Sequence, residues 1–376
     1  MSAPEIRAEA RRALGICDAC GYCNGFCDLF EAARRRPALT EADLAHLANL
    51  CHACRNCFHA CQYAPPHVFA VNIPLALARM RHQSYLDHVW PRALAPLLNR
   101  PVATVVWVTL GAILLLFGLM LAVAPANGGV TVGTDTGVGA FYRVLPWSAM
   151  VWIGVLPLGW SALAIGIGWR RYWTLTRPKD TVANEAVQPG RALWSTLADI
   201  LDLRNLRGGG PGCNDLDARF SHWRRRLHQT LLSGLGLSFA ATLAATLYHH
   251  GLGLEAPYPV LSAPVLLGTL GGLALLVAVL GLGWIEWRAD PAPLAPEARR
   301  LDRAFLGLLS VVAGSGLALL VWRSTPAMAP LLGVHLGTVL AFFLLLPYSK
   351  FVHSGYRAIA LVRESLDRVS IRRDNA

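Results

Sequence analysis

Residues 16–27, ICDACGYCNGFC, and residues 51–61, CHACRNCFHAC, decide the fold of this chain. Each stretch separates its four cysteines by two, two and three residues. In this spacing three thiolates wrap around one [4Fe–4S] cube, and the fourth reaches a neighbouring cube. The chain has nine cysteines, and all but Cys213 belong to the pattern. The pattern therefore predicts two [4Fe–4S] clusters.

The ligand sets are expected to cross between the two stretches. One cluster is expected on Cys17, Cys20, Cys23 and Cys61. The other is expected on Cys51, Cys54, Cys57 and Cys27. Zinc sites need only paired cysteines, and disulfides belong to oxidising compartments. We expect no disulfides, because no cleavable signal peptide precedes the cysteines.

The segment between the two cysteine sets carries a helix signal. Thr40 is a helix N-cap candidate with Asp43 three residues on, and Leu44, Leu47 and Leu50 follow at helical spacing. Asp28 and Gln62 stand where a proline usually follows the fourth cysteine of a compact bacterial ferredoxin. We therefore expect residues 1–101 to form a helical ferredoxin-like domain, resembling the cluster-bearing half of fumarate-reductase iron–sulfur subunits.

The composition places the rest of the chain in a membrane. Of 376 residues, 54% are hydrophobic and only 15% are charged, whereas globular chains carry about 25% charged residues. Residues 102–376 contain six apolar runs long enough to span a bilayer, which needs about 20 residues. These runs are approximately 102–124, 147–169, 229–249, 260–284, 304–322 and 332–352. The predicted fold is all-α, with a cluster domain followed by a six-helix membrane bundle.

The net charge of +11 comes from basic residues that lie mainly on one side of the predicted spans. Membrane topology accounts for this placement, so we expect no nucleic-acid partner. Only Arg143 and Arg323 lie in the connections 125–146, 250–259 and 323–331. The other basic residues lie in the N-terminal domain, the loops 170–228 and 285–303, and the C-terminal tail. The positive-inside rule predicts that the clusters and both termini are cytoplasmic.

The loop at 170–228 is too long for a simple connector. Residues 192–206 carry apolar side chains at helical spacing and are expected on the membrane or domain surface. Gly208–Gly210 and Gly212 allow a close backbone approach to another body, either the cluster domain or a partner subunit. Cys213 is expected to be a packed thiol, because both cluster sets are complete without it.

Four histidines at the ends of the third and sixth runs are candidate haem ligands. His335 and His353 are five helical turns apart on the sixth run, so they would share one face about 27 Å apart. His228 and His249 occupy the two ends of the third run, and His250 is a rival to His249. Pro347 is expected to kink the sixth run near His353. A single histidine at a span end is also compatible with a purely interfacial residue.

Two facing spans would offer one histidine pair at each membrane face. A haem iron with two axial imidazoles needs one ligand from each of two facing helices. The pairs predict one or two haems b, with His228 and His353 on the cytoplasmic side and His249 and His335 on the outer side. No CxxCH motif for haem c is present.

The chain as a whole resembles the tricarballylate-utilisation protein B family, also called citrate-utilisation protein B. The resemblance rests on the double cysteine motif, YAPPHVFAVNIP, GGGPGCN with FSHWRRRLHQ, ATLYHH and YPVLSAPVLLGTLGG. The chain is also similar to the C-terminal half of the cobalamin-pathway protein CobZ. Its sixth run resembles the gamma-subunit helix of membrane nitrate reductases, which implies haem ligation by His335 and His353.

The family resemblance implies a protein of the bacterial inner membrane that reoxidises a flavoprotein. The partner would be an FAD-dependent dehydrogenase similar to tricarballylate dehydrogenase, and the electron acceptor would be a quinone in the membrane lipid. Two alternatives stay open at this point: an oxygen-using step in corrin-ring biosynthesis, and a membrane redox sensor. The chain shows no GxGxxG motif and no substrate-dehydrogenating site of its own.

Overall fold

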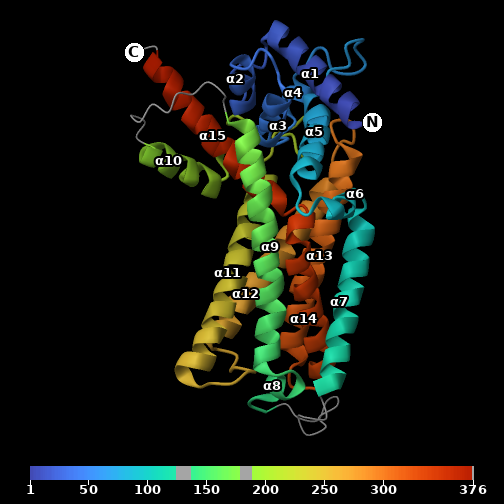
Figure 1. Cartoon of the computed structure of the whole chain (residues 1–376), viewed down its shortest axis with the longest axis vertical. Coiled ribbons are helices and arrows are strands. Elements are labelled where there is room, and N and C mark those ends of the chain that lie inside the picture. Colours follow the sequence, from blue (N-terminus) through green and yellow to red (C-terminus); the bar gives the residue numbers. More distant parts are fainter. Residues whose placement is uncertain (124–136, 178–188, 375–376) are drawn as a thin grey trace.

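The computed structural model describes residues 1–123, 137–177 and 189–374 (Figure 1). Over these ranges the chain is helical, and an isolated β-bridge between Cys213 and Ser221 is the one piece of strand-like pairing. The all-α prediction is thereby confirmed. Parts of the predicted connection 125–146 and of the loop 170–228 lie outside the described residues.

Five helices form the N-terminal domain: α1 (Ala3–Cys20), α2 (Asp28–Arg34), α3 (Glu41–Leu50), α4 (Asn56–His59) and α5 (Ile73–His88). The predicted capping box is present, since the Thr40 hydroxyl accepts from the Asp43 amide at 3.2 Å while the Asp43 carboxylate accepts from Thr40. Leu44, Leu47 and Leu50 of α3 are buried in the core of the domain. The domain therefore folds around α3, which lies between the two cysteine sets.

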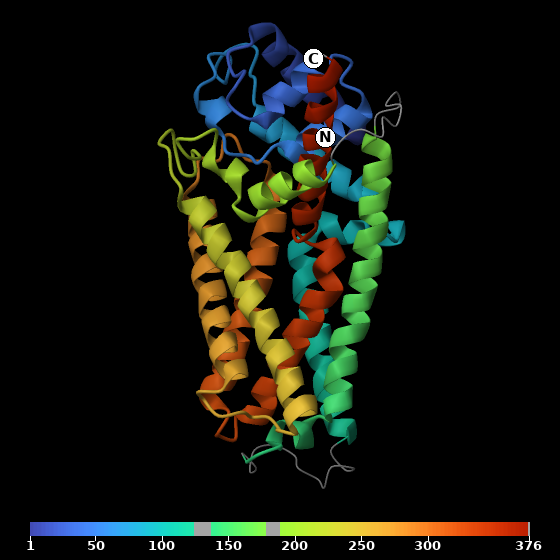
Figure 2. The ribbon, with the colours of Figure 1, turned by 90° about the vertical axis from the view of Figure 1, so that its left-hand side faces the viewer.

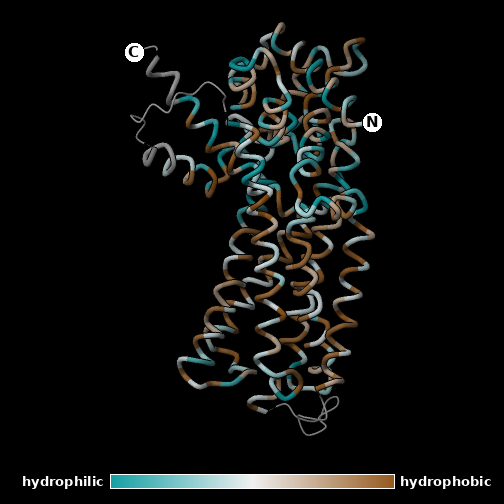
Figure 3. Tube along the Cα trace, viewed as in Figure 1, coloured by the Kyte–Doolittle hydropathy of each residue, from teal (hydrophilic) through white to brown (hydrophobic). Residues whose placement is uncertain are grey.

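Six helices are long and apolar enough to cross a membrane. Each overlaps one of the six predicted runs. They are α7 (Pro101–Val123), α9 (Trp147–Thr176), α11 (Trp223–Leu252), α12 (Ala263–Arg288), α13 (Pro296–Trp322) and the helical segment that begins with α14 (Met328–Leu345). Hydrophobic residues dominate this bundle, while polar residues gather at the end that carries the N-terminal domain (Figure 3). Large apolar side chains such as Trp107 and Leu114 are exposed on the bundle, as lipid contact requires.

Short helices complete the chain. The 3₁₀ helix η1 (Arg92–Leu94) and α6 (Pro96–Asn99) lead from the N-terminal domain to α7, and α8 (Ala140–Val144) lies at the opposite end of the bundle. In the long loop, α10 (Pro189–Leu201) and η2 (Arg204–Arg207) account for the predicted surface helix. Trp194, Leu197 and Leu201 of α10 are exposed.

The last part of the chain departs from the prediction of one continuous sixth span. Helix α14 ends at Leu345, a 3₁₀ turn η3 (Leu346–Tyr348) contains Pro347, and Ser349 is extended before α15 (Val352–Asp374) begins. Pro347 lacks an amide hydrogen and its ring clashes with the preceding turn, so the helix is broken rather than kinked. His335 and His353 thus lie on different helices, and the expectation that they share one helix face is wrong.

Helix α15 leaves the bundle and packs along the N-terminal domain (Figure 2). The buried carboxylate of Glu364 pairs with Arg35, and Arg368 pairs with Asp28 at 2.7 Å. His46 on α3 lies 3.5 Å from the same Glu364 carboxylate. These ion pairs hold the C-terminal helix at the end of the molecule that also carries α1.

Candidate iron–sulfur and haem sites

The first hollow in the N-terminal domain is lined by Cys17, Cys20, Cys23 and Cys61. We call these residues the first cage. Helix α1 delivers Cys17 and Cys20, and Gly21, in the left-handed conformation at φ 67°, ends the helix and turns the chain toward Cys23. Cys20 is exposed, so the first cage opens to the surface.

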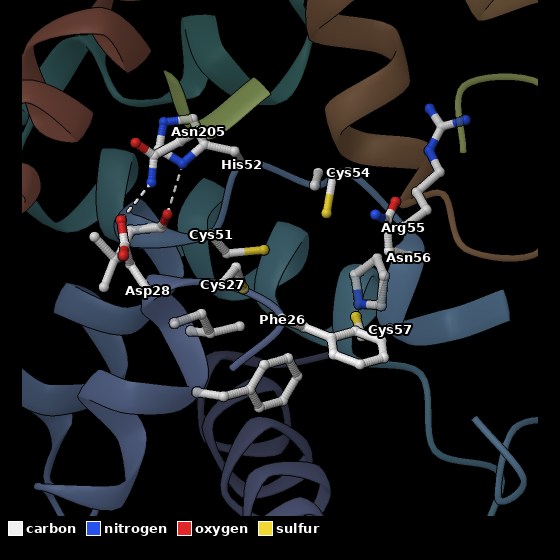
Figure 4. Close-up of a pocket in the computed structure, with 15 residues that line it drawn as sticks. Phe26, Cys27, Asp28, Cys51, His52, Cys54, Arg55, Asn56, Cys57 and Asn205 are labelled. Carbon is white, nitrogen blue, oxygen red and sulfur yellow. Dashed lines mark hydrogen bonds between the residues drawn. The ribbon is translucent and has the colours of Figure 1, made fainter. Parts of the chain in front are cut away.

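The second hollow is lined by Cys27, Cys51, Cys54 and Cys57, and we call these residues the second cage. Figure 4 shows their sulfurs turned toward one common space. Cys27 precedes α2 and Cys51 follows α3, while Ala53 (φ 51°) and Arg55 (φ 68°) curl the backbone around Cys54. Cys51 is buried, and the other three are partly buried.

The two hollows divide the eight cysteines as the crossed scheme does. Burial, followed by the charge of neighbouring cysteines, raises the pKa of Cys17 to about 12 and of Cys23 to about 11. Binding of iron must therefore displace protons from these thiols. Among the described residues, no three His, Cys, Asp or Glu side chains are close enough to hold a single metal ion. Four thiols spread around a hollow fit the larger [4Fe–4S] cube better than one ion.

The glycine-rich segment 203–222 covers the second cage. The Asn56 amide donates to the Gly208 carbonyl at 2.8 Å and to the Gly212 carbonyl at 2.9 Å. The amide of Asn214 donates to the Cys54 carbonyl at 2.9 Å and to Asn56 Oδ1 at 3.2 Å. An added Cβ on Gly209 would collide with the Phe26 carbonyl. The body that the glycines approach is therefore the cluster domain of the same chain.

Cys213 is buried in this covering segment, as expected for a packed thiol. Its thiol donates to the Leu206 carbonyl at 3.3 Å and lies against Cys54. The contact with Cys54, together with burial, raises the pKa of Cys213. It is a neighbour of a candidate ligand rather than a ninth member of either cage.

Arginines from three different helices hold the main chain of the second cage. Arg81 of α5 donates to the carbonyls of Ala48 at 2.7 Å and Cys51 at 2.6 Å. Arg357 of α15 donates to the same Cys51 carbonyl at 3.2 Å, and Arg224 of α11 donates to the Ala53 carbonyl at 2.8 Å. Sequence reasoning missed the role of Arg81 and Arg224, because a single arginine carries no signal of the carbonyl that it binds.

The two histidines predicted for the cytoplasmic haem lie near one another. His228 is close enough to His353 to contribute to its electrostatic surroundings, and Arg357 contributes to the surroundings of both. Both residues are partly buried. His228 Nδ1 donates to the Arg224 carbonyl at 2.8 Å, and His353 Nδ1 donates to the Lys350 carbonyl. This leaves Nε2 unprotonated on both rings, the form that binds iron.

The two histidines predicted for the outer haem make different contacts. His335 Nδ1 lies 3.1 Å from the Ser315 hydroxyl of α13. The His249 ring stacks on Trp147 at 5.0 Å between ring centres, and its buried Nδ1 has no hydrogen-bond partner among the described residues. His250 is exposed and meets the same Trp147 edge-on. The outer pair therefore has one ring positioned by a hydrogen bond and one positioned by aromatic packing.

Two family models match the two parts of the chain. The family model described as citrate utilization protein B Fer4-like domain matches residues 10–87, and the model of citrate utilization protein B matches residues 96–374. Citrate utilization protein B of Escherichia coli is 38% identical over 369 residues, covering 97% of this chain and 93% of the relative. The chain belongs to the citrate utilization protein B family. No solved structure matches it.

Membership of the citrate utilization protein B family accords with the sites described. The Fer4-like match at residues 10–87 contains all eight cysteines of the two cages, which indicates iron–sulfur cluster binding. The six apolar helices make this member a multi-pass membrane protein. Together these features indicate an electron-transfer role in tricarboxylate utilisation, as the resemblance implied.

Proposed function

We propose that the protein is an electron relay from a flavoprotein dehydrogenase to a membrane quinone. The donor would be an FAD-dependent, tricarballylate dehydrogenase-like flavoprotein that docks on residues 1–101. The cofactors would be two [4Fe–4S] clusters, one in each cage, and one or two haems b in the domain 102–376. When bound, these groups supply one-electron chemistry, and the chain supplies ligands, burial and fixed distances.

One observation carries the proposal more than any other. Arg224 lies one helical turn before His228 on α11, and Arg357 lies one turn after His353 on α15. Both arginines bind the main chain of the second cage. The two helices that carry candidate haem ligands are thus fixed directly to the nearest cysteine set. A sensor that passes no electrons onward would not need this connection.

The chain's own residues have separate tasks in this relay. Exposed Cys20 leaves the first cage accessible to a docking partner, while segment 203–222 packs against the second cage. His228 and His353 present Nε2 for an axial bond to iron on the cytoplasmic side, and His249 and His335 are proposed for the outer side. The location proposed is the bacterial inner membrane, and the basic loops favour an orientation with both termini in the cytoplasm.

The proposal predicts the effect of His353→Ala. The variant should lose the absorbance of one low-spin haem and keep its iron–sulfur clusters, measured by reduced-minus-oxidised spectra with haem and iron quantification. His88→Ala is a matched control, because His88 is also buried and also donates from Nδ1, to the Ser84 carbonyl at 2.7 Å. An unchanged haem spectrum in His353→Ala, or equal haem loss in the control, would contradict the ligand assignment.

The complete relay is tested in membranes that contain the protein. A chemically reduced flavoprotein should reduce the haem. An added quinone should then reoxidise the haem within the turnover time of the flavoprotein dehydrogenase. Haem that is reduced but never reoxidised by quinone would contradict the proposed acceptor and favour a sensing role.

A further inference from the structure

Positive charge is distributed very unequally between the two cages. The main chain around the second cage is contacted by Arg81, Arg224 and Arg357, and Arg55 lines the second hollow itself. Arg55 and Arg81 are buried, with only 6% and 4% of their surface exposed. Among the described residues that line the first hollow, none carries a charged side chain.

Acidic groups near these arginines offset only part of the charge. The buried Asp215 is closest, since its main-chain carbonyl accepts from Arg55 at 2.7 Å and its carboxylate accepts from the Arg224 amide at 3.4 Å. Asp302 is paired with Lys350 at 2.6 Å, and Glu286 is paired with Arg299 at 2.7 Å. Asp28 lines the second hollow as well, but its carboxylate is paired with Arg368 at 2.7 Å. Because these three carboxylates are paired with other cations, the four arginines at the second cage are offset mainly by Asp215.

We infer that these four arginines raise the reduction potential of the second cage's cluster above that of the first, and thereby direct electrons toward the membrane. Reduction adds one negative charge to a cluster, and nearby positive charge stabilises that state. The effect is large in a buried setting, where a unit charge a few ångströms away is screened far less than in water. The inference rests on the proposed function, because it presupposes a cluster in each cage.

Solvent acts in the opposite direction at the first cage, since water around exposed Cys20 also stabilises a reduced cluster. Water can reorient only partly around a reduced cluster in a half-covered hollow. The arginine charges, by contrast, are permanent and are held in place by hydrogen bonds. We therefore expect the arginines to outweigh solvent. The reduction potential would then be higher at the second cage than at the exposed first cage, and electrons would pass toward His228 and His353.

The test is a redox titration of the purified, intact chain, followed by the paramagnetic signals of the two reduced clusters. Cys20→Ser removes the first cluster and so assigns the remaining signal to the second cage. In the unmodified chain the second cluster should become reduced at the higher potential. Arg357→Gln, which keeps an amide near the Cys51 carbonyl but removes the charge, should lower only that potential, and Arg357→Lys should largely restore it.

Arg224→Gln is an independent variant on another helix and should shift the same cluster in the same direction. Arg12→Gln is the matched control, because Arg12 binds the Phe69 carbonyl at 2.9 Å at the exposed surface of the domain. It should leave both potentials unchanged. If the first cluster were reduced at the higher potential, or if neither Arg357→Gln nor Arg224→Gln shifted the potential of the second cluster, this inference would be overturned and the proposed function would not. Absence of two cluster signals from the unmodified chain would overturn the proposed function with it.

Discussion

The first and second cages share one cysteine spacing but differ in what surrounds them. The first cage is made by residues of the N-terminal domain and opens to the surface at Cys20. The second cage is covered by segment 203–222 and held by arginines of α5, α11 and α15. The cysteine motif therefore specifies which residues can bind iron, and distant parts of the chain specify how that iron is enclosed.

The difference also separates two requirements of an electron relay. A cage that meets a soluble partner must be accessible, and a cage that passes electrons into a bilayer must be fixed relative to the membrane helices. Accessibility is achieved by leaving the first cage uncovered. Fixation is achieved by hydrogen bonds from Arg224 and Arg357, which lie on the helices of His228 and His353.

The largest expected effect is that of removing one ligand from each cage. Cys54→Ser should lose the cluster of the second cage and with it about half of the bound iron. It should also loosen segment 203–222, because the Cys54 carbonyl and thiol both contact that segment. Cys20→Ser should lose a similar amount of iron and leave the segment protected. Iron and sulfide quantification with limited proteolysis measures both effects, and loss of the same paramagnetic signal in both variants would refute the crossed ligand sets.

A smaller effect is expected from Gly209→Ala. Gly209 has φ 78°, and its new Cβ would collide with the Phe26 carbonyl beside the second cage. Strain and collision together should cost about 2–4 kcal/mol in the docking of the segment. Hydrogen exchange of the Asn214 amide should speed up accordingly. Gly210→Ala meets nothing within 4 Å, so any effect there reports backbone strain at φ 135° alone. Unchanged exchange in Gly209→Ala would argue against the close approach.

The next effect is that of Asn56→Ala, which removes the side chain that joins the second cage to its cover. Three hydrogen bonds disappear, to Gly208, Gly212 and Asn214, and the docking of the segment should weaken by about 1–3 kcal/mol. Thermal unfolding and exchange of the segment report the change. Tyr22 is the corresponding residue of the first set and is exposed, so Tyr22→Ala should leave the segment unaffected. A similar loss in both variants would mean that the two cages are covered alike.

The smallest expected effect is that of Cys213→Ala. Cys213 lies against Cys54 without belonging to a cage, so both clusters should be retained and stability should fall by only about 1 kcal/mol. Iron content and the two paramagnetic signals are the measurements. Loss of about half of the iron would show that Cys213 is a ligand and would contradict the assignment of four cysteines to each cage.

The sequence predicted those parts of the fold that depend on local pattern. The six apolar runs, the Thr40 capping box and the two cysteine sets each carry a signal within a few residues, and each has a counterpart in the structure. Pro347 signalled a disturbance of the last span, but proline alone does not distinguish a kink from a break. The break separated His335 from His353, which periodicity had placed on one face.

The enclosure of the second cage was not predictable in the same way. Gly208–Gly210 indicated a close approach without naming the surface that is approached. Arg81 is a single buried basic residue of α5, and nothing in its neighbours reveals that it binds the Cys51 carbonyl. Such contacts join residues far apart in the chain, so only the folded arrangement shows them.

The separation between Cys51 and Arg357, 306 residues along the chain, has a consequence for biogenesis. A ribosome finishes the cysteine domain long before it synthesises the helix whose Arg357 binds the Cys51 carbonyl. The contacts of the second cage with α15 can therefore form only after the last membrane span has been made. The order of translation thus completes the surroundings of the first cage, which lie within the N-terminal domain, before those of the second.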